Sequence, residues 1–223
     1  MKEVVLDTET TGLSVKEGHR IVEIGCIEID NLVPTKNVFH SYLNPERKVS
    51  ESAFNVHGYS DEFLSNKKKF FEIATEFLNF INNKRIVIHN AEFDLAHLNN
   101  ELSLSGLKPI DTTNVVDTLA LARDKFPGSS NSLDALCKRY RIDNSRREKH
   151  TALIDCELLS KVYINLLGQR EPSLNFNSNT DVDLITESYN SGLYSKIIVH
   201  ASEQETKLHK EFLQNQMKKN NFS

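Results

Sequence analysis

The chain has 223 residues, a formal net charge of −4, 26% charged residues and 39% hydrophobic residues. This length suits one main domain with an appendage, and this composition is ordinary for a soluble globular protein. No apolar stretch approaches the roughly 18 residues that a membrane-spanning helix needs, and the first residues lack a signal-peptide pattern. We therefore expect a cytoplasmic protein that does not bind membranes.

The net charge and the cysteines limit the possible classes of protein further. A negative total argues against binding nucleic acid through bulk electrostatics, so a nucleic-acid function would need local positive charge or metal ions. Cys26, Cys137 and Cys156 lie in apolar or helical patterns without the spacing of a zinc site. We expect them to be reduced and buried.

Hydrophobic patterns predict that the chain begins with strands. Segments 3–9, 20–29 and 37–43 predict three strands with short connections, with a turn at 30–35, and hence an antiparallel meander. Apolar residues at three- and four-residue steps then predict a helix over 61–83, and "RIVIH" at 85–89 predicts a short strand.

Three more helices complete the main domain. They are expected over 90–106, 131–142 and 151–168, and the last has an apolar stripe made of Leu158, Leu159, Val162, Tyr163, Leu166 and Leu167. Alternation of strands and helices makes the class mixed α/β.

The composition changes after residue 168. Residues 169–192 are polar and rich in Asn, Ser, Thr and Asp, which is typical of a flexible linker. Within 193–223 we expect a strand at 194–201 and a helix at 202–217 with a narrow apolar face. One small amphipathic unit cannot form a core alone, so it should dock on the main domain, 1–168, or on another protein.

Two carboxylates in the first strand point to chemistry. Asp7 and Glu9 are two residues apart, so they project from the same face and repel each other unless a cation or a proton intervenes. A solvated strand end would also explain them. Asp94 and Asp155, however, lie in the opening turns of two predicted helices, and each alone would suit a capping acid. Together the four acids predict a site for Mg²⁺ or Mn²⁺.

His150 precedes Asp155 by five residues. On a continuous helix this spacing separates the two side chains by roughly 140°, so His150 is better placed on the loop before the helix. There it would face the acids and act as a general base, because imidazole titrates near neutral pH. An ordinary surface histidine is the alternative.

These motifs resemble those of the DEDD exonuclease superfamily, in its His-containing branch. The motifs are "LDTETTG" with Asp7 and Glu9, "HNAEFDLAHLNNE" with Asp94, and "HTALIDCELL" with His150 and Asp155. The likeness covers residues 3–168 and is greatest to the epsilon proofreading subunits of bacterial DNA polymerase III.

The resemblance implies an α/β fold, a ribonuclease H-like mixed sheet flanked by helices, with a flexible C-terminal tail. It also implies a 3′–5′ DNA exonuclease that removes mispaired 3′-terminal nucleotides by phosphodiester hydrolysis with two Mg²⁺ or Mn²⁺ ions per active site. Asp7 would bridge the ions, Glu9, Asp94 and Asp155 would complete their coordination, and His150 would deprotonate the attacking water.

Substrate contacts are expected beside the metals. The resemblance assigns them to Asp7, Glu9, Thr10, Ser52, His57 and Asp155, although Ser52 stands where close relatives often have an acid. A turn histidine is the alternative for His57. A cationic segment near the expected base would bind along the backbone of a nucleic-acid single strand, unless it is merely a solvated face. The segment comprises Lys138, Arg139, Arg141, Arg146, Arg147 and Lys149.

The resemblance also implies partners. They are the single-stranded 3′ end of DNA, the polymerase III catalytic (alpha) subunit bound through 193–223, a small theta-like accessory subunit, and the sliding clamp. Glu171 departs from the Gln that begins the clamp motif in relatives, which leaves clamp binding open. Two alternative functions are an RNA-trimming exonuclease of the same superfamily and a non-catalytic replicase scaffold.

Overall fold

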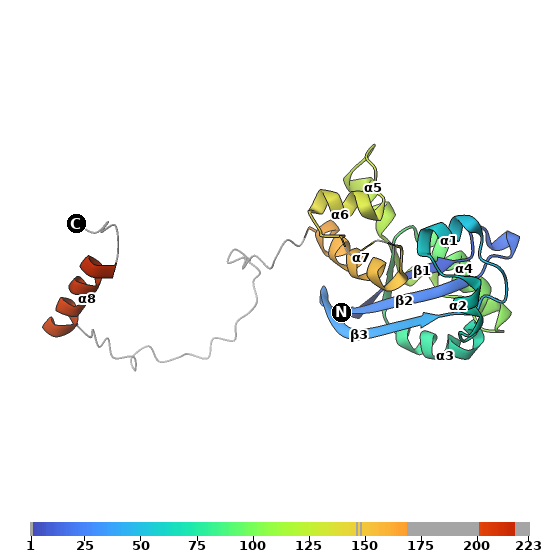
Figure 1. Cartoon of the computed structure of the whole chain (residues 1–223), viewed down its shortest axis with the longest axis horizontal. Coiled ribbons are helices and arrows are strands. Elements are labelled where there is room, and N and C mark those ends of the chain that lie inside the picture. Colours follow the sequence, from blue (N-terminus) through green and yellow to red (C-terminus); the bar gives the residue numbers. More distant parts are fainter. Residues whose placement is uncertain (1, 146, 148, 169–200, 217–223) are drawn as a thin grey trace, which may run out of the picture. The chain divides into compact units, whose positions relative to one another are not determined.

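The computed structural model describes residues 2–145, 147, 149–168 and 201–216 (Figure 1). The chain divides into two compact units, Met1–Leu174 and Asn175–Ser223. The second unit contributes helix α8, Glu203–Gln216, which is described by itself. The expected linker at 169–192 and most of the expected strand at 194–201 lie outside the described residues.

The first unit is built on one mixed sheet. Within its described residues five strands lie in the order β3-β2-β1-β4-β5. Neighbours β1–β2 and β2–β3 are antiparallel, whereas β1–β4 and β4–β5 are parallel, which confirms the predicted meander and the α/β class. The strands are β1 Lys2–Thr10, β2 Ile21–Asp30, β3 Val33–Tyr42, β4 Arg85–Ile88 and β5 Val115–Asp117.

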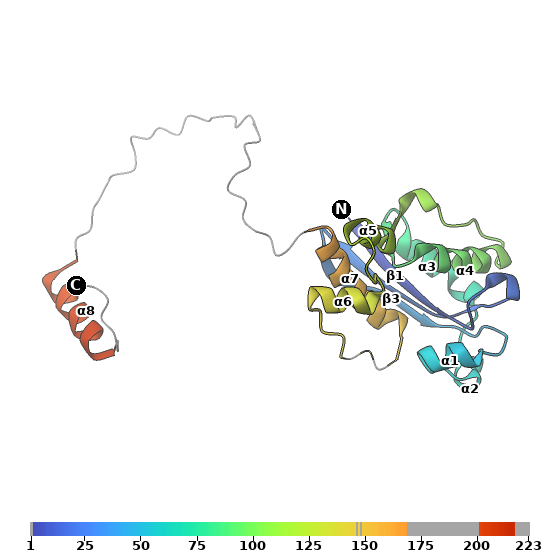
Figure 2. The ribbon, with the colours of Figure 1, turned by 90° about the horizontal axis from the view of Figure 1, so that it is seen from above.

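Helices cover both faces of this sheet (Figure 2). One core cluster joins β1 and β2 to α3 and α4, and the other joins the opposite face to α5, α6 and α7. The α-helices are α1 Glu51–His57, α2 Asp61–Ser65, α3 Phe70–Ile81, α4 Ala91–Leu104, α5 Thr118–Lys125, α6 Leu133–Tyr140 and α7 Ala152–Leu166, with short 3-10 turns at Val15–Glu17 and Thr112–Asn114. In the part of the chain that the structure describes, no helix is both long and apolar enough to cross a membrane. The three cysteines are free and buried, as expected.

The helix expected over 61–83 is wrong as a single element. It breaks between α2 and α3, where the backbone of Lys68 forms a bridge with Leu43 and accepts a hydrogen bond from Asn44 N. After the break, Lys69 N donates to Glu72 Oε2 at 2.6 Å, which satisfies one of the free N–H groups at the start of α3. Tertiary pairing with β3's end thus overrides a continuous apolar pattern.

The turn expected at 30–35 is also too long. β2 and β3 are joined by Asn31 and Leu32, both at positive φ, so β3 begins at Val33. Pro34 is tolerated inside β3 because this strand lies at the edge of the sheet. Three elements were not expected at all, namely α1, β5 and α5, and Leu167 is 44% exposed instead of joining the core stripe.

Helix α7 lies unusually close to β2. A Cβ atom added to Gly25 would fall 2.6 Å from the carbonyl carbon of Ala152, so only glycine permits this approach. Cys156 Sγ also donates to Gly25 O at 3.2 Å. Since α7 carries Asp155 near its start, this close contact sets the position of one wall of the candidate site.

A buried ion pair ties α4 to the start of β2. Arg20 Nε and Nη2 donate to the two carboxylate oxygens of Glu101 at 2.6 and 2.7 Å. Glu101 is 1% exposed, and its Oε1 also accepts from Ile21 N at 3.4 Å. The pair satisfies a carboxylate that would be strongly destabilising if left alone.

We predict that Arg20→Met destabilises the protein by about 3 kcal/mol, because it leaves the Glu101 carboxylate buried and unpaired. The double variant Arg20→Met, Glu101→Met should recover at least half of that loss, since apolar side chains of similar volume replace the whole pair. Urea unfolding of the three proteins measures this. A double variant no more stable than Arg20→Met would contradict the prediction.

Candidate active site

The structure brings the predicted catalytic residues together. Asp7, Glu9, Asp94, His150 and Asp155 all line one cleft of about 800 Å³ at the end of the sheet. They come from β1, from the first turns of α4 and α7, and from the loop before α7. Ligand atoms of Glu9, His150 and Asp155 lie within 4.8 Å of one another.

Strand β1 places its two acids side by side. In the register with β2, Asp7 lies opposite Gly25 and Glu9 lies opposite Glu23. The register shifts directly after Glu9, at a bulge that ends the regular pairing. Bulges of this kind occur beside active sites, where they redirect the chain. Both carboxylates therefore occupy the same face at the last regular positions of the strand.

Thr8, the residue between Asp7 and Glu9, holds Asp94 in place. Thr8 donates to Asp94 Oδ1 through its backbone N at 3.0 Å and through Oγ1 at 2.7 Å. Helix α4 starts from Asn90, whose φ of 65° lies in the left-handed region that Asn tolerates. Asp117 Oδ1 accepts from Asn90 N at 3.0 Å, so the end of β5 fixes where α4 begins.

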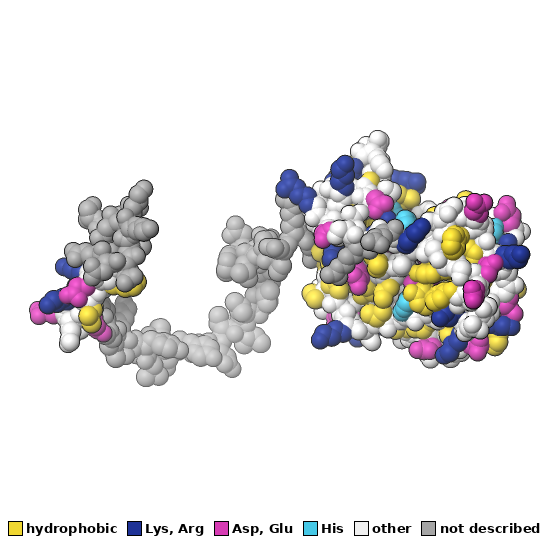
Figure 3. Space-filling view, viewed as in Figure 1, with side chains coloured by type: hydrophobic (Ala, Val, Ile, Leu, Met, Phe, Trp, Pro, Cys, Tyr) yellow, Lys and Arg dark blue, Asp and Glu magenta, His cyan; other side chains and the backbone are white. Residues whose placement is uncertain are grey.

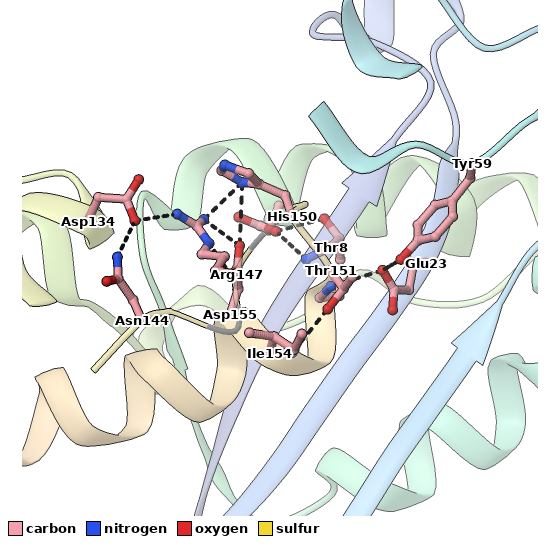
Figure 4. A network of polar contacts seen from close by, with 12 residues as sticks. Thr8, Glu23, Tyr59, Asp134, Asn144, Arg147, His150, Thr151, Ile154 and Asp155 are labelled. Atoms are coloured by element: carbon pink, nitrogen blue, oxygen red, sulfur yellow. Dashed lines mark hydrogen bonds and ion pairs between the residues drawn. The ribbon is translucent and has the colours of Figure 1, made fainter. Parts of the chain in front are cut away.

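His150 lies before α7, as expected. Helix α7 is capped by Thr151, whose hydroxyl accepts from Ile154 N, and Asp155 follows in its first turns. His150 N donates to Val56 O at 3.2 Å, which ties this loop to α1. Its imidazole is 44% exposed, with Nδ1 3.5 Å from Asp155 Oδ2 (Figure 4).

Arg147 clamps Asp155 and His150. Its guanidinium donates to both oxygens of Asp155 at 2.5 and 2.6 Å, and Nη2 lies 2.8 Å from His150 Nδ1. Its Nη1 donates to Asp134 at 2.7 Å. Because guanidinium only donates, Nδ1 of His150 must be the accepting nitrogen, and the neutral ring carries its proton on Nε2.

These contacts of Arg147 change the interpretation of the cationic segment. The Arg147 side chain is 7% exposed and faces the carboxylates, so it does not join a surface track in this arrangement. Lys149 Nζ donates to Asn55 O, and Arg139 lies over the Phe126 ring. Arg146 lies outside the described residues.

The acids raise one another's proton affinity. Burial, reinforced by Asp155 and Glu23, raises the pKa of Glu9 to about 8. Burial raises the pKa of Asp94 to about 7 against the lowering effect of the Thr8 hydrogen bonds. Burial and the charges of Asp94, Asp155 and Glu9 hold the pKa of Asp7 well above its usual range. The ionised cluster therefore requires added positive charge.

These residues fit divalent cations. Hard ions such as Mg²⁺ and Mn²⁺ select carboxylate oxygens, and the cleft presents the four predicted carboxylates, from three elements. Burial and the neighbouring Arg147 charge lower the pKa of His150, so its imidazole is neutral at pH 7 and able to accept a proton. An acidic cation site next to a neutral imidazole suits hydrolysis of a phosphodiester.

Four of the six predicted substrate residues line a second cavity, whereas Asp7 and Asp155 line the main cleft. Thr10, Ser52 and His57 border a hollow of about 230 Å³ that shares Thr8, Glu9 and Phe93 with the main cleft. Ser52 is exposed, whereas His57 is 2% exposed, stacks on Tyr59 and accepts from Tyr59 N through Nδ1. Leu13, which is 82% exposed, adds an apolar side chain to the lining of this hollow.

Sequence reasoning missed three site residues. Thr8 was overlooked because alternation points it away from Asp7 and Glu9, yet this is the side from which Asp94 approaches. The cationic pattern predicts that Arg147 lies on the surface, and no local signal indicates its contact with Asp155, eight residues further on. Glu23 is an acid inside a β-branched strand, and such a buried position is a warning that it has donors nearby.

Comparison with known proteins identifies the family. The exonuclease family RNase T matches residues 4–163. The DNA polymerase III epsilon subunit of Rickettsia conorii is 46% identical over 219 residues, which cover 96% of this chain and 95% of that protein. The epsilon subunit of Escherichia coli is 49% identical over 175 residues, 75% of this chain and 72% of that protein.

Solved structures share the fold at lower identity. Exonuclease X in complex with 5′ overhanging duplex DNA has a TM-score of 0.59 and 24% identity, covering 74% of this chain and 90% of its own. The nuclease domain of 3′hExo, a DEDDh family member bound to rAMP, has a TM-score of 0.65 and 16% identity, covering 75% and 92%. Taken with the sequence matches, the chain belongs to the RNase T exonuclease family and, within it, to the epsilon subunits of DNA polymerase III.

Proposed function

We propose that this protein removes mispaired 3′-terminal nucleotides from DNA as the proofreading subunit of a replicative polymerase. The observation that carries this proposal is the convergence of four acids and His150 on one cleft, beside a hollow of about 230 Å³. The identity with epsilon subunits along almost the whole chain supports the replicase setting.

Each residue has a role in this proposal. Asp7, Glu9, Asp94 and Asp155 would hold two divalent cations, Mg²⁺ or Mn²⁺. When bound, such ions stabilise the attacking and leaving oxygens of the displacement. Thr8 keeps Asp94 facing β1, and His150 accepts the proton of the attacking water.

Arg147 must move before His150 can act. A neutral imidazole has one accepting nitrogen, and in this structure Arg147 Nη2 occupies it. The same guanidinium occupies both oxygens of Asp155. Proton transfer to Nδ1 of His150 therefore requires Arg147 to withdraw from His150 and Asp155.

The terminal nucleotide would enter the smaller hollow. Thr10, Ser52 and the buried His57 line it, together with the exposed Leu13. Ser52 offers a hydroxyl where an acid would offer a charge, so its contact with the sugar would be a neutral hydrogen bond. This hollow meets the acids at Glu9, so the last phosphodiester would lie near the cleft.

The C-terminal segment, 193–223, would bind the polymerase catalytic subunit. Helix α8 exposes Leu208 and Phe212, which are four residues apart and therefore share one face. Figure 3 shows exposed hydrophobic side chains on this helix. Tethering through a linker at 169–192 would raise the concentration of the exonuclease near the primer end. A theta-like accessory subunit, the sliding clamp and a cytoplasmic location belong to the same proposal.

The first prediction concerns activity. With Mg²⁺ or Mn²⁺ the protein should shorten a 5′-labelled single strand from its 3′ end, and Asp7→Ala should slow this by at least about 100-fold, because the cation site loses a central ligand. Asp124→Ala, at an exposed acid, is the matched control, and EDTA should stop the wild type. Faster trimming of RNA than of DNA would favour the RNA alternative, and no trimming of either would favour the scaffold.

The second prediction concerns stability without metal. Glu9 has a folded-state pKa of about 8 against 4.5 in the unfolded chain, so the folded state binds this proton more tightly. Its ionisation therefore destabilises the fold as pH rises from about 4.5 to about 8, provided no cation is bound. Glu9→Gln should melt at least about 3 °C above the wild type near pH 8 in EDTA.

The two proteins should melt together near pH 3.5, where Glu9 is largely protonated in both states, which gives an internal control. An equal difference at both pH values would show that burial of the charge is not the cause.

The third prediction concerns the tail. Replacing Leu208 and Phe212 by Asp should weaken binding to the polymerase catalytic subunit by about 2 kcal/mol or more, because the apolar face of α8 is lost. Exonuclease activity on free DNA should not change. Lys210→Ala, on another face, is the control, and undiminished binding of the double variant in calorimetry would place the interface elsewhere.

A further inference from the structure

A buried acid that takes no part in the proposed chemistry lies beside the catalytic cleft. Glu23, in the middle of the sheet on β2, has no exposed surface. Its carboxylate accepts three hydrogen bonds: from His40 Nε2 at 2.7 Å, from Tyr59 Oη at 2.8 Å and from Ala152 N at 2.9 Å. A carboxylate in such a place is costly unless its donors are fixed, so this set of contacts is specific.

The contact with Ala152 joins the sheet to the start of α7. Ala152 is the first residue of that helix, where backbone N–H groups lack partners within the helix. A negative charge at this end also interacts favourably with the helix dipole. Glu23 Oε2 therefore fixes the first turn of α7, and Asp155 lies three residues further on.

The strand register turns this contact into a positioning device. Glu23 pairs with Glu9, and Gly25 pairs with Asp7, so the two β2 residues that receive α7 lie directly opposite the two β1 acids. The absent side chain of Gly25 lets the helix approach, and the Glu23 carboxylate fixes where it stops. The first turn of α7 is thereby held against β1.

The Glu23 carboxylate also contacts the segment that follows α1. Tyr59, whose hydroxyl donates to Glu23, follows the turn after α1, and His150 N donates to Val56 O of that helix. Figure 4 shows Glu23 between Tyr59 and the Thr151 end of α7, with Asp155 and His150 beyond. One buried group thus connects α1, α7 and the sheet.

We propose that Glu23 is a positioning residue, whose carboxylate sets the first turn of α7 so that Asp155 and His150 face Asp7 and Glu9. The proposal rests on the proposed exonuclease function. An apolar residue at this position would fill the space but leave Ala152 N, Tyr59 Oη and His40 Nε2 without their acceptor.

Two near-isosteric variants of the full chain test this. Glu23→Met keeps the volume and removes the oxygen acceptors, whereas Glu23→Gln keeps an oxygen for Ala152 N. Glu28→Met is the matched control, because Glu28 is a 3% exposed acid on the same strand. Its partners Lys2, Thr35 and Lys84 do not line the cleft. The readouts are kcat and KM on single-stranded DNA and the Mn²⁺ affinity from calorimetry.

Glu23→Met should lower kcat and the Mn²⁺ affinity by about tenfold or more with little change in KM, as expected when a support of metal ligands is lost. Glu23→Gln should restore most of both, and Glu28→Met should alter melting temperature only. The proposal is overturned if Glu23→Met keeps wild-type kcat and Mn²⁺ affinity, or if Glu28→Met loses them equally.

Two checks keep the outcome clear. If Glu23→Met does not fold, Tyr59→Phe decides instead: loss of the hydroxyl that orients Oε2 should lower kcat at least about twofold, and a wild-type kcat would overturn the proposal. If the wild type does not degrade DNA, the proposed function fails, and the Mn²⁺ affinities of the same variants still test the role of Glu23.

Discussion

Repulsion among four carboxylates crowded at the end of one sheet is the constraint on which the rest of this structure depends. Burial raises the pKa values of Asp7, Glu9 and Asp94, and the charges of the other acids add to this for Asp7 and Glu9, so the ionised cluster is unstable without a counter-charge. Arg147 provides part of it through Asp155. The remaining negative charge favours the binding of divalent cations together with a phosphodiester. Stability is given up locally so that the site can bind them.

The fold tolerates this repulsion because residues outside the cluster hold the acids in place. Asp94 is held by two hydrogen bonds from Thr8, and α4 starts where Asp117 receives Asn90 N. Helix α7 rests on β2 at Gly25 and Glu23. The repelling groups therefore cannot separate without breaking buried contacts in the surrounding elements. Such support from rigid strands and helix starts is what preorganised sites require.

Much of this was predictable from the sequence because local patterns determine it. The spacing of Asp7 and Glu9 on a strand and the placement of His150 before a helix need only the geometry of those elements. The break between α2 and α3 and the contacts of Arg147 do not follow from local pattern, since they depend on pairing with Leu43 and on a partner eight residues away. β5 has three residues, too few for a periodic signal, yet its last residue positions α4. Long-range contacts therefore account for what the sequence left out.

A crystal structure with Mn²⁺ and a nucleoside monophosphate, recorded at a wavelength where manganese scatters anomalously, would test the central claim most directly. The account predicts two anomalous peaks roughly 3.5–4 Å apart among Asp7, Glu9, Asp94 and Asp155, with Arg147 withdrawn from Asp155 and His150. A nucleotide bound without anomalous signal at these carboxylates, and with the Arg147 contacts intact, would contradict it.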